Sequence, residues 1–169
     1  VVVTGAGSGI GREFALAFAR AGAAVVVNDL ARAADAAGGE GWAADAVVAE
    51  IIAAGGRALA NTDSVAEAAS AARIVQAAVD QFGRIDCVVN NAGILRDRFF
   101  FNMSLDEWKA VIDVHLNGAF YVSRAAAPHF KSQGSGAYVH MVSTSGLIGN
   151  LGQANYAAAK AGIAGMSKC

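Results

Sequence analysis

The stretch VVVTGAGSGIGREFALAFARA, residues 1–21, decides the fold. Its three opening valines predict a β-strand, and residues 12–21 have a helical pattern whose apolar side includes Phe14 and Phe18. A glycine-rich loop lies between them. Glycines let a backbone approach a ligand closely, and the free N–H groups at a helix N-terminus attract an anion. The order strand, glycine loop, helix therefore predicts a phosphate-binding loop at the start of an α/β domain.

The spacing of the glycines narrows this prediction. The common GxGxxG pattern fails because Ile10 occupies one of its positions, whereas Gly5, Gly9 and Gly11 fit a GxxxGxG spacing. Ser8 and Ile10 lie between these glycines and belong to the same predicted binding loop. A tight turn without a ligand is the alternative, and the flanking strand and helix favour phosphate binding.

The rest of the chain alternates between strands and helices. Further strands are predicted at 23–27, 57–60, 85–89 and 137–142. Further helices are predicted at 43–54, 65–81 and 104–127 and around Tyr156, continuing to Ala164. This alternation predicts an α/β fold with a doubly wound parallel sheet that has helices on both faces, in three layers, α/β/α. We expect residues 1–169 to form a single domain whose C-terminal part, including the last strands and a substrate lid, lies beyond Cys169.

Local breakers and caps set the expected boundaries of two segments. Residues 31–42 are predicted to form a long loop, with Gly38, Gly39 and Gly41 as the clearest breakers. The fourth helix is predicted to begin with a capping box formed by Ser104 and Glu107 and to end at Pro128.

Composition and charge exclude several classes of function. Of the 169 residues, 55% are hydrophobic and 16% charged, which excludes a disordered protein and allows a sizeable core. The net charge is −1 without a basic run, so nucleic acid is not an expected partner. The apolar runs are too short to cross a membrane. Cys87 and Cys169 lack a CxxC spacing and are expected to be reduced, and no metal site is predicted.

Acidic residues follow two of the predicted strands, at the edge of a parallel sheet where ligands bind. Asp29 follows the second strand, where a carboxylate can accept hydrogen bonds from an adenosine ribose and would repel a 2′-phosphate. This predicts NAD rather than NADP, and Arg32 nearby leaves NADP open. Asp63, followed by Ser64, comes after the third strand and is predicted to contact the adenine edge, to cap the helix at 65–81, or both.

The fourth predicted strand ends in the pair Asn90-Asn91. Adjacent Asn side chains at a strand end can fix neighbouring backbone through hydrogen bonds. Both are therefore included in the predicted cofactor site, with a simple turn as the alternative.

The stretch from Ser143 to Lys160 carries the predicted chemistry. Tyr156 and Lys160 are four residues apart and share one face of a predicted helix. An ammonium held beside a phenol favours the phenolate, which makes proton exchange easier near neutral pH. Ser143 follows the fifth strand, thirteen residues before Tyr156, where its hydroxyl could hydrogen-bond a substrate oxygen as charge develops on it. The alternative is an ordinary helix with Lys160 in solvent.

Together these motifs resemble the short-chain dehydrogenase/reductase family. The resemblance covers the whole chain in the family's order and rests on Thr4-Gly5-x-x-x-Gly9-x-Gly11, Asn90-Asn91-Ala92-Gly93, Ser143 and Tyr156-x-x-x-Lys160. The resemblance implies a Rossmann-type domain that binds a nicotinamide cofactor. The cofactor would contact the glycine loop, the acidic residues after the second and third strands and the Asn90-Asn91 pair, together with Tyr156 and Lys160. In that family Tyr156 would be the general acid/base, and Lys160 would make it more acidic and hold the nicotinamide ribose. Ser143 would orient the substrate oxygen, so that Ser143 and Tyr156 bind substrate.

A closer similarity is to the (3R)-hydroxyacyl-CoA dehydrogenase units of type 2 peroxisomal multifunctional enzymes and their bacterial relatives. It rests on residues 26–30, the long segment 31–42, residues 91–98 and residues 149–156. It implies NAD-dependent oxidation of a 3-hydroxyacyl-CoA to the 3-ketoacyl-CoA in fatty-acid β-oxidation. It also implies a homodimer or homotetramer, which would be cytoplasmic in a bacterium and peroxisomal in a eukaryote.

Two alternatives to this function are kept. One is an NADPH-dependent 3-oxoacyl-thioester (acyl carrier protein) reductase, which Asp29 disfavours. The other is a nucleotide-binding interaction module without catalysis, which the intact set of Ser143, Tyr156 and Lys160 disfavours.

One position departs from the family pattern. Many members carry a catalytic Asn three residues before the glycine in the middle of the fourth helix, and counting back from Gly118 that position is His115. Asn117 would point elsewhere around the helix. His115 is therefore predicted to hold the proton-relay water in place of the Asn. The alternatives are a relay through backbone carbonyls, or a packed and hydrogen-bonded helix histidine.

Overall fold

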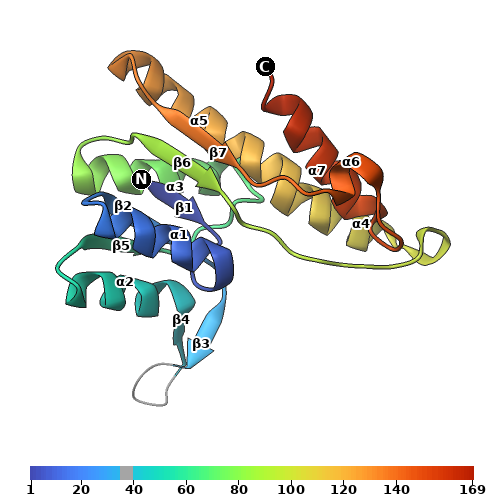
Figure 1. Ribbon diagram of the computed structural model, residues 1–169, viewed down its shortest axis with the longest axis horizontal. Helices are drawn as coiled ribbons and strands as arrows, with labels where there is room; N and C mark the ends of the chain where they lie inside the picture. Colours follow the sequence, from blue (N-terminus) through green and yellow to red (C-terminus); the bar gives the residue numbers. More distant parts are fainter. Residues whose placement is uncertain (35–39) are drawn as a thin grey trace.

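The computed structural model describes residues 1–34 and 40–169 (Figure 1). Its main sheet has five parallel strands in the order β5 (Arg57–Asn61), β2 (Ala24–Asn28), β1 (Val2–Thr4), β6 (Cys87–Asn90) and β7 (Ala137–His140). The helices are α1 (Gly9–Arg20), α2 (Ala43–Ala53), α3 (Ala68–Phe82), α4 (Leu105–Ile112), α5 (Gly118–Gln133), α6 (Ser145–Ile148) and α7 (Ala154–Met166). The described part also contains a 3₁₀-helix, η1 (Phe100–Asn102), and a π-helix, η2 (Asp113–Asn117). The predicted α/β fold is confirmed.

The two faces of the sheet bury two separate hydrophobic clusters. Val2, Val26 and Val88 are neighbours in the parallel register, and they pack against α3 and α5. Because side chains alternate along a strand, the next residues face the other way. The opposite cluster, against α1 and α2, contains the strand residues Val3, Val25, Val27 and Val89. Helices therefore cover the sheet on both faces, which gives the predicted three layers.

The predicted fourth helix starts as expected and ends later. The capping box is confirmed, because the Ser104 hydroxyl accepts from the Glu107 N–H at 3.1 Å and the Glu107 carboxylate accepts from the Ser104 N–H at 2.9 Å. The prediction that Pro128 ends the helix is wrong, since α5 continues to Gln133. A proline inside a helix costs about 3 kcal/mol. The buried α5 residues on both sides of it, among them Ala126 and Phe130, hold the helix against the core.

The predicted long loop 31–42 is partly wrong. Residues of β3 (Arg32–Ala34) pair antiparallel with β4 (Glu40–Trp42), and the Arg32 guanidinium lies 4.4 Å from the centre of the Trp42 ring. Gly38 and Gly39 lie outside the described residues. The short helix α6 forms in the segment between Ser143 and Tyr156, where no helix was predicted.

Candidate active site

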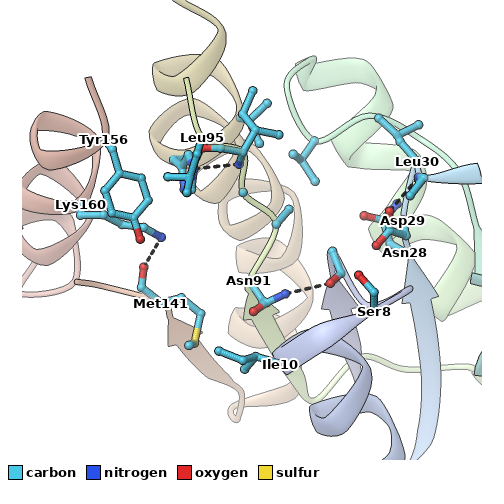
Figure 2. Close-up of a pocket in the computed structure, with 18 of the residues that line it drawn as sticks. Ser8, Ile10, Asn28, Asp29, Leu30, Asn91, Leu95, Met141, Tyr156 and Lys160 are labelled. Atoms are coloured by element: carbon cyan, nitrogen blue, oxygen red, sulfur yellow. Dashed lines mark hydrogen bonds between the residues drawn. The ribbon is translucent and has the colours of Figure 1, made fainter. Parts of the chain in front are cut away.

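A cleft of about 760 Å³ opens at the carboxyl ends of the central strands (Figure 2). From β1 the chain builds the sheet outward through β2 to β5, and then crosses back to place β6 on the other side of β1. Open parallel sheets bind ligands at such a switch point. Figure 2 shows Tyr156 and Lys160 at one end of the cleft, Asp29 and Leu30 at the other, and Ile10 and Asn91 between them.

The glycine loop forms the floor of the cleft because side chains do not fit there. Gly5 and Gly9 have φ values of 63° and 53°, a backbone region that favours glycine. A Cβ atom on Gly11 would lie 2.1 Å from the carbonyl oxygen of Gly5. The side-chain amide of Asn91 braces this turn, since it donates to the carbonyl oxygens of Thr4 at 3.0 Å and Gly5 at 2.9 Å. The conformation of the loop is therefore fixed by its glycines and by the side chain of Asn91.

The N-terminus of α1 is suited to an anion. Its N-cap, Ser8, makes no side-chain cap bond, and the first turn contains no acidic residue. The first N–H groups of a helix have no intrahelical acceptor. Ser8 and Ile10 line the cleft at this end of the helix. These features match the requirements of a bound phosphate.

Asp29 lies at the predicted position, in the wall of the cleft after β2. Its two carboxylate oxygens accept hydrogen bonds from the backbone N–H groups of Gly7 and Ala31, each at 2.8 Å. These bonds fix the orientation of the carboxylate. Each carboxylate oxygen can accept a second hydrogen bond, so capacity for ribose hydroxyls remains.

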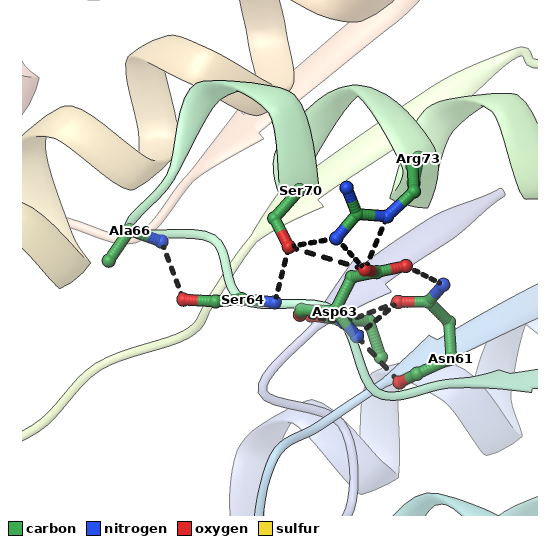
Figure 3. Close-up of polar contacts among 7 residues, drawn as sticks. Asn61, Asp63, Ser64, Ala66, Ser70 and Arg73 are labelled. Carbon is green, nitrogen blue, oxygen red and sulfur yellow. Dashed lines mark hydrogen bonds and ion pairs between the residues drawn. The ribbon is translucent and has the colours of Figure 1, made fainter.

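Asp63 lines the cleft but does not cap α3, so that part of the prediction is wrong (Figure 3). The N-cap is Glu67, without a side-chain cap bond. Asp63 instead accepts hydrogen bonds from Arg73 at 2.7 Å, Asn61 at 3.0 Å and Ser70 at 3.2 Å. Partial burial raises the pKa of Asp63, but the hydrogen bonds from Arg73 and Asn61 outweigh this effect and leave it below the ordinary value. The carboxylate is therefore ionised and rigidly held.

Two other predicted cofactor residues face away from the cleft. The Ser64 hydroxyl accepts from the backbone N–H of Ala66 at 3.2 Å. Asn90 is 7% exposed, and its side-chain amide donates to Ser123 at 2.9 Å and contacts Nδ1 of His140 at 3.2 Å. Asn90 therefore ties β6 to α5 and β7. Gly9 and Gly11 do not line the cleft, and they act through the shape of the loop, since Gly9 has a positive φ and Gly11 packs against the carbonyl of Gly5.

Tyr156 and Lys160 share one face of α7 at the end of the cleft. Lys160 is only 4% exposed, so the alternative of a lysine in solvent is wrong. Its ammonium donates to the carbonyl oxygen of Met141 at 2.6 Å and lies 5.5 Å from the centre of the Tyr156 ring. Burial lowers the pKa of Lys160 to about 8. A buried cation is thus fixed beside the phenol.

Ser143 is half-buried and lies in the turn after β7. Its hydroxyl oxygen accepts from the Ser145 N–H at 3.2 Å, and the residue does not form part of the cleft wall. The helix that follows packs tightly on α7, because a Cβ atom on Gly146 would lie 2.7 Å from the backbone nitrogen of Ala161. The fold therefore brings the Ser143 turn against the helix that carries Tyr156 and Lys160.

His115 is 4% exposed and projects from the π-helix η2 into the wall of the cleft. Its Nε2 lies 3.0 Å from the backbone nitrogen and 2.8 Å from the carbonyl oxygen of Ile94. Its ring meets the Tyr156 ring edge-on, with 5.2 Å between centres. Burial lowers the pKa of His115 to about 4, so the imidazole is neutral at physiological pH. Asn117 instead donates to Asp113 at 2.8 Å.

Two residues that position the site were missed. The Thr4 hydroxyl accepts from the backbone N–H groups of Asn91 and Ala92, each at 3.1 Å, and so joins β1 to the end of β6. Asn155 is fully buried, and its side-chain oxygen accepts from the Tyr156 N–H at 2.8 Å. A polar residue next to Tyr156 in an alanine-rich helix is a signal that could have indicated this brace.

The described residues were also searched for metal-binding clusters and for membrane-spanning helices. Among residues 1–34 and 40–169, no group of three or more His, Cys, Asp or Glu side chains could hold a metal ion. No helix in the described part of the chain has the length and apolar character needed to cross a membrane.

Known proteins share this architecture and sequence. A family model described as short chain dehydrogenase matches residues 1–169. The chain is 55% identical over 166 residues to peroxisomal multifunctional enzyme type 2 of Mus musculus, covering 98% of this chain and 22% of that protein. It is 46% identical over 167 residues to a 3-oxoacyl-[acyl-carrier-protein] reductase of Synechocystis sp. The match covers 99% of this chain and 64% of that protein.

A solved structure has the same fold. The crystal structure of a short chain dehydrogenase from Mycobacterium avium matches with a TM-score of 0.89 at 49% identity, covering 98% of this chain and 59% of that one. The chain spans less than two thirds of the length of each of these relatives. The match over residues 1–169 and the shared fold show that the chain belongs to the short-chain dehydrogenase family.

Proposed function

We propose that the protein is an NAD-dependent oxidoreductase that interconverts a secondary alcohol and a ketone, with a 3-hydroxyacyl-CoA as the substrate of the whole protein. The observation that carries this proposal is the buried ammonium of Lys160, fixed by Met141 beside Tyr156 at the end of the cleft. A relative from Mycobacterium tuberculosis that is 47% identical over 174 residues is named a hydroxyacyl-CoA dehydrogenase, which supports the choice of an acyl-CoA substrate.

The residues of the cleft fit a dinucleotide. Gly5 lines the cleft without a side chain, so a ligand can approach the loop backbone closely there. The first turn of α1 would hold the pyrophosphate, and Asp63 would reach the adenine end. Asp29 would accept the ribose hydroxyls, and its carboxylate would repel a 2′-phosphate, which favours NAD over NADP. When bound, the nicotinamide supplies or accepts the hydride.

The chain's own residues would handle the proton. Tyr156 would exchange it with the substrate oxygen, and the Lys160 ammonium would stabilise the phenolate. Since the Ser143 oxygen already accepts from the Ser145 N–H, the hydroxyl proton of Ser143 is available to donate to the substrate oxygen. The amide of Asn91 would keep the loop in shape without touching the reacting atoms.

A second candidate is an NADPH-dependent reductase of 3-oxoacyl groups on acyl carrier protein. The Synechocystis relative, which bears that name, favours it. The carboxylate of Asp29 at the expected ribose position counts against it.

One experiment separates these candidates. Full-length protein is assayed with acetoacetyl-CoA and with acetoacetyl-acyl carrier protein, each with NADH and with NADPH. We expect turnover of the CoA thioester with NADH and kcat/KM with NADPH lower by about tenfold or more. A preference for NADPH and the carrier protein would support the second candidate. No turnover with either thioester, despite NADH binding, would point to a non-catalytic nucleotide-binding module.

We further propose that the protein assembles as a homodimer or homotetramer. Large apolar side chains on α4 and α5 are exposed, among them Leu105 (85%) and Phe120 (47%), and burial against another copy would remove this surface from water. The peroxisomal name of the mouse relative supports a peroxisomal location in a eukaryote, and a bacterial protein would be cytoplasmic. The molar mass of full-length protein by light scattering tests the assembly.

A further inference from the structure

Three segments that are far apart in sequence meet next to Ser143. One follows β6 and contains Asp97, the second is the turn after β7 together with α6, and the third leads into α7 through Gln153. Figure 1 shows α6 beside α7. The first and third segments are joined directly, since the backbone N–H of Arg98 donates to the carbonyl oxygen of Gly152 at 2.8 Å. The side chain of Gln153 bonds to both of the other segments.

Gln153 is an unusual residue for its position in the helix. It is the N-cap of α7, where Ser, Thr, Asp and Asn are preferred because their short side chains accept from the first N–H groups of a helix. Within residues 40–169, the Gln153 side chain makes no such cap bond. A better capping residue would stabilise α7, so the side chain at this position serves other contacts than those of the helix it begins.

The side-chain amide of Gln153 is bonded at both of its ends. Its Nε2 donates to a carboxylate oxygen of Asp97 at 2.9 Å. Its Oε1 accepts from the Ser145 hydroxyl at 3.0 Å and from the Asn150 side-chain amide at 3.1 Å. An ionised carboxylate can only accept hydrogen bonds, so Asp97 determines which end of the amide faces it. The oxygen of Gln153 must then face Ser145.

The orientation of Gln153 reaches Ser143 through a single residue. Because the Gln153 oxygen can only accept, the Ser145 hydroxyl must donate to it, which fixes Ser145 at the start of α6. The backbone N–H of Ser145 in turn donates to the Ser143 Oγ at 3.2 Å. A hydroxyl whose oxygen already accepts still has its proton for another acceptor. The chain of bonds from Asp97 therefore leaves the Ser143 proton for a substrate oxygen.

We propose that Gln153 is a positioning residue which, locked in one orientation by Asp97, holds Ser145 and so keeps the Ser143 hydroxyl ready to donate. The effect on turnover rests on the proposed function, whereas the orientation of the side chains does not. Gln153 is not among the described residues that line the cleft, so it acts through Ser143 and does not touch the reacting atoms.

A double-mutant cycle tests whether Gln153 acts through Ser143. Full-length variants are compared in single-turnover reduction of acetoacetyl-CoA by NADH. Gln153→Leu keeps a similar volume without the amide, and we expect it to lower the rate roughly five- to fiftyfold with the Kd for NADH changed by less than about twofold. In a Ser143→Ala background the same substitution should cost less than about twofold, because the group that Gln153 positions is absent. Equal losses in both backgrounds would refute the proposal, since Gln153 would then act through α7 and Tyr156.

A second variant leaves Gln153 in place and removes its lock. In Asp97→Asn the neutral amide can donate as well as accept, so Gln153 is no longer restricted to one orientation. We expect the rate to fall by about two- to tenfold, less than in Gln153→Leu. An unchanged rate would remove Asp97 from the proposal.

The chain contains a matched control pair. Gln76 is exposed on α3, donates to Asp80 at 2.7 Å, and is not among the described residues that line the cleft. Gln76→Leu and Asp80→Asn make the same chemical changes and should leave the rate within about twofold of wild type. Losses as large as those at Gln153 and Asp97 would refute a specific role for the pair near Ser143.

Crystal structures of full-length wild type and Gln153→Leu separate failure of this proposal from failure of the proposed function. The Ser143 side chain should have one rotamer in wild type, and a different one or several in the variant. If wild type turns over no thioester but the Ser143 rotamer depends on Gln153, the proposed function fails and the positioning role stands. If the protein is active and Ser143 keeps its rotamer in Gln153→Leu, the positioning role fails alone.

Discussion

Two buried nitrogen bases, Lys160 and His115, lie next to the Tyr156 ring. Burial lowers the pKa of Lys160 to about 8 and that of His115 to about 4, so near pH 7 the first is mostly charged and the second is neutral. A charged His115 beside the ammonium would add repulsion. The difference between the two pKa values therefore lets one cation act on the phenol while the histidine serves as a neutral hydrogen-bonding group.

The low pKa of His115 predicts an acid-sensitive fold. The unfolded histidine titrates near 6.5 and the folded one near 4, so between these pH values the unfolded state binds more protons and stability falls as the pH falls. The loss amounts to about 3 kcal/mol at full protonation. Urea unfolding at pH 7, 5.5 and 4.5 measures it. His115→Asn should remove only part of the dependence of stability on pH, because burial also lowers the pKa of His140, which stays in the variant. The same dependence in the variant and in wild type would contradict the assignment to His115.

Cofactor choice is predicted to depend on Asp29. In Asp29→Asn the amide oxygen can keep the bond from the Gly7 N–H, while the negative charge that would repel a 2′-phosphate is lost. We expect the ratio of kcat/KM for NADPH over NADH to rise by roughly tenfold or more. Asp45→Asn, exposed on α2 and outside the cleft wall, is the matched control. A ratio that does not change in Asp29→Asn would exclude the ribose contact.

At the scale of elements, the segment that follows β6 packs directly against the π-helix η2, and the contact leaves no space for a side chain at Gly93. A Cβ atom on Gly93 would lie 2.3 Å from Cε1 of His115. Gly93→Ala should therefore displace the His115 ring and destabilise the fold by about 1–3 kcal/mol. In α7, Gly165 has no atom within 4 Å of an added Cβ, so Gly165→Ala should be neutral or stabilising by up to about 1 kcal/mol. The free energy of unfolding of both variants is measured in urea. Equal stabilities of Gly93→Ala and Gly165→Ala would contradict the close packing of Gly93 against His115.

Elements with a clear apolar period could be predicted from the sequence, and those held by tertiary contacts could not. The valine runs of β1, β2 and β6 indicate buried parallel strands, because both of their faces pack against helices. The β3–β4 pair shows no such pattern, since its residues alternate little in polarity. Pro128 suggested a helix end because local sequence does not report the packing that keeps α5 intact.

At the scale of the molecule, the site combines residues from both ends of the chain. Their positions at strand ends could be predicted, because a parallel sheet brings its carboxyl ends to one edge. The directions of their side chains could not. Asn90 faces α5 and β7 whereas its neighbour Asn91 faces the glycine loop, and the Ser143 hydroxyl is turned toward Ser145. Such choices depend on contacts between segments far apart in sequence.

The central claim is that Tyr156 transfers the proton in an NAD-linked oxidation or reduction. It is tested most directly by comparing Tyr156→Phe with wild type in full-length protein, using NADH oxidation by acetoacetyl-CoA for turnover and NADH fluorescence for binding. Loss of the phenol hydroxyl should lower kcat by about 10²–10⁴-fold and leave the Kd for NADH within about twofold. Turnover by Tyr156→Phe at the wild-type rate would contradict the account.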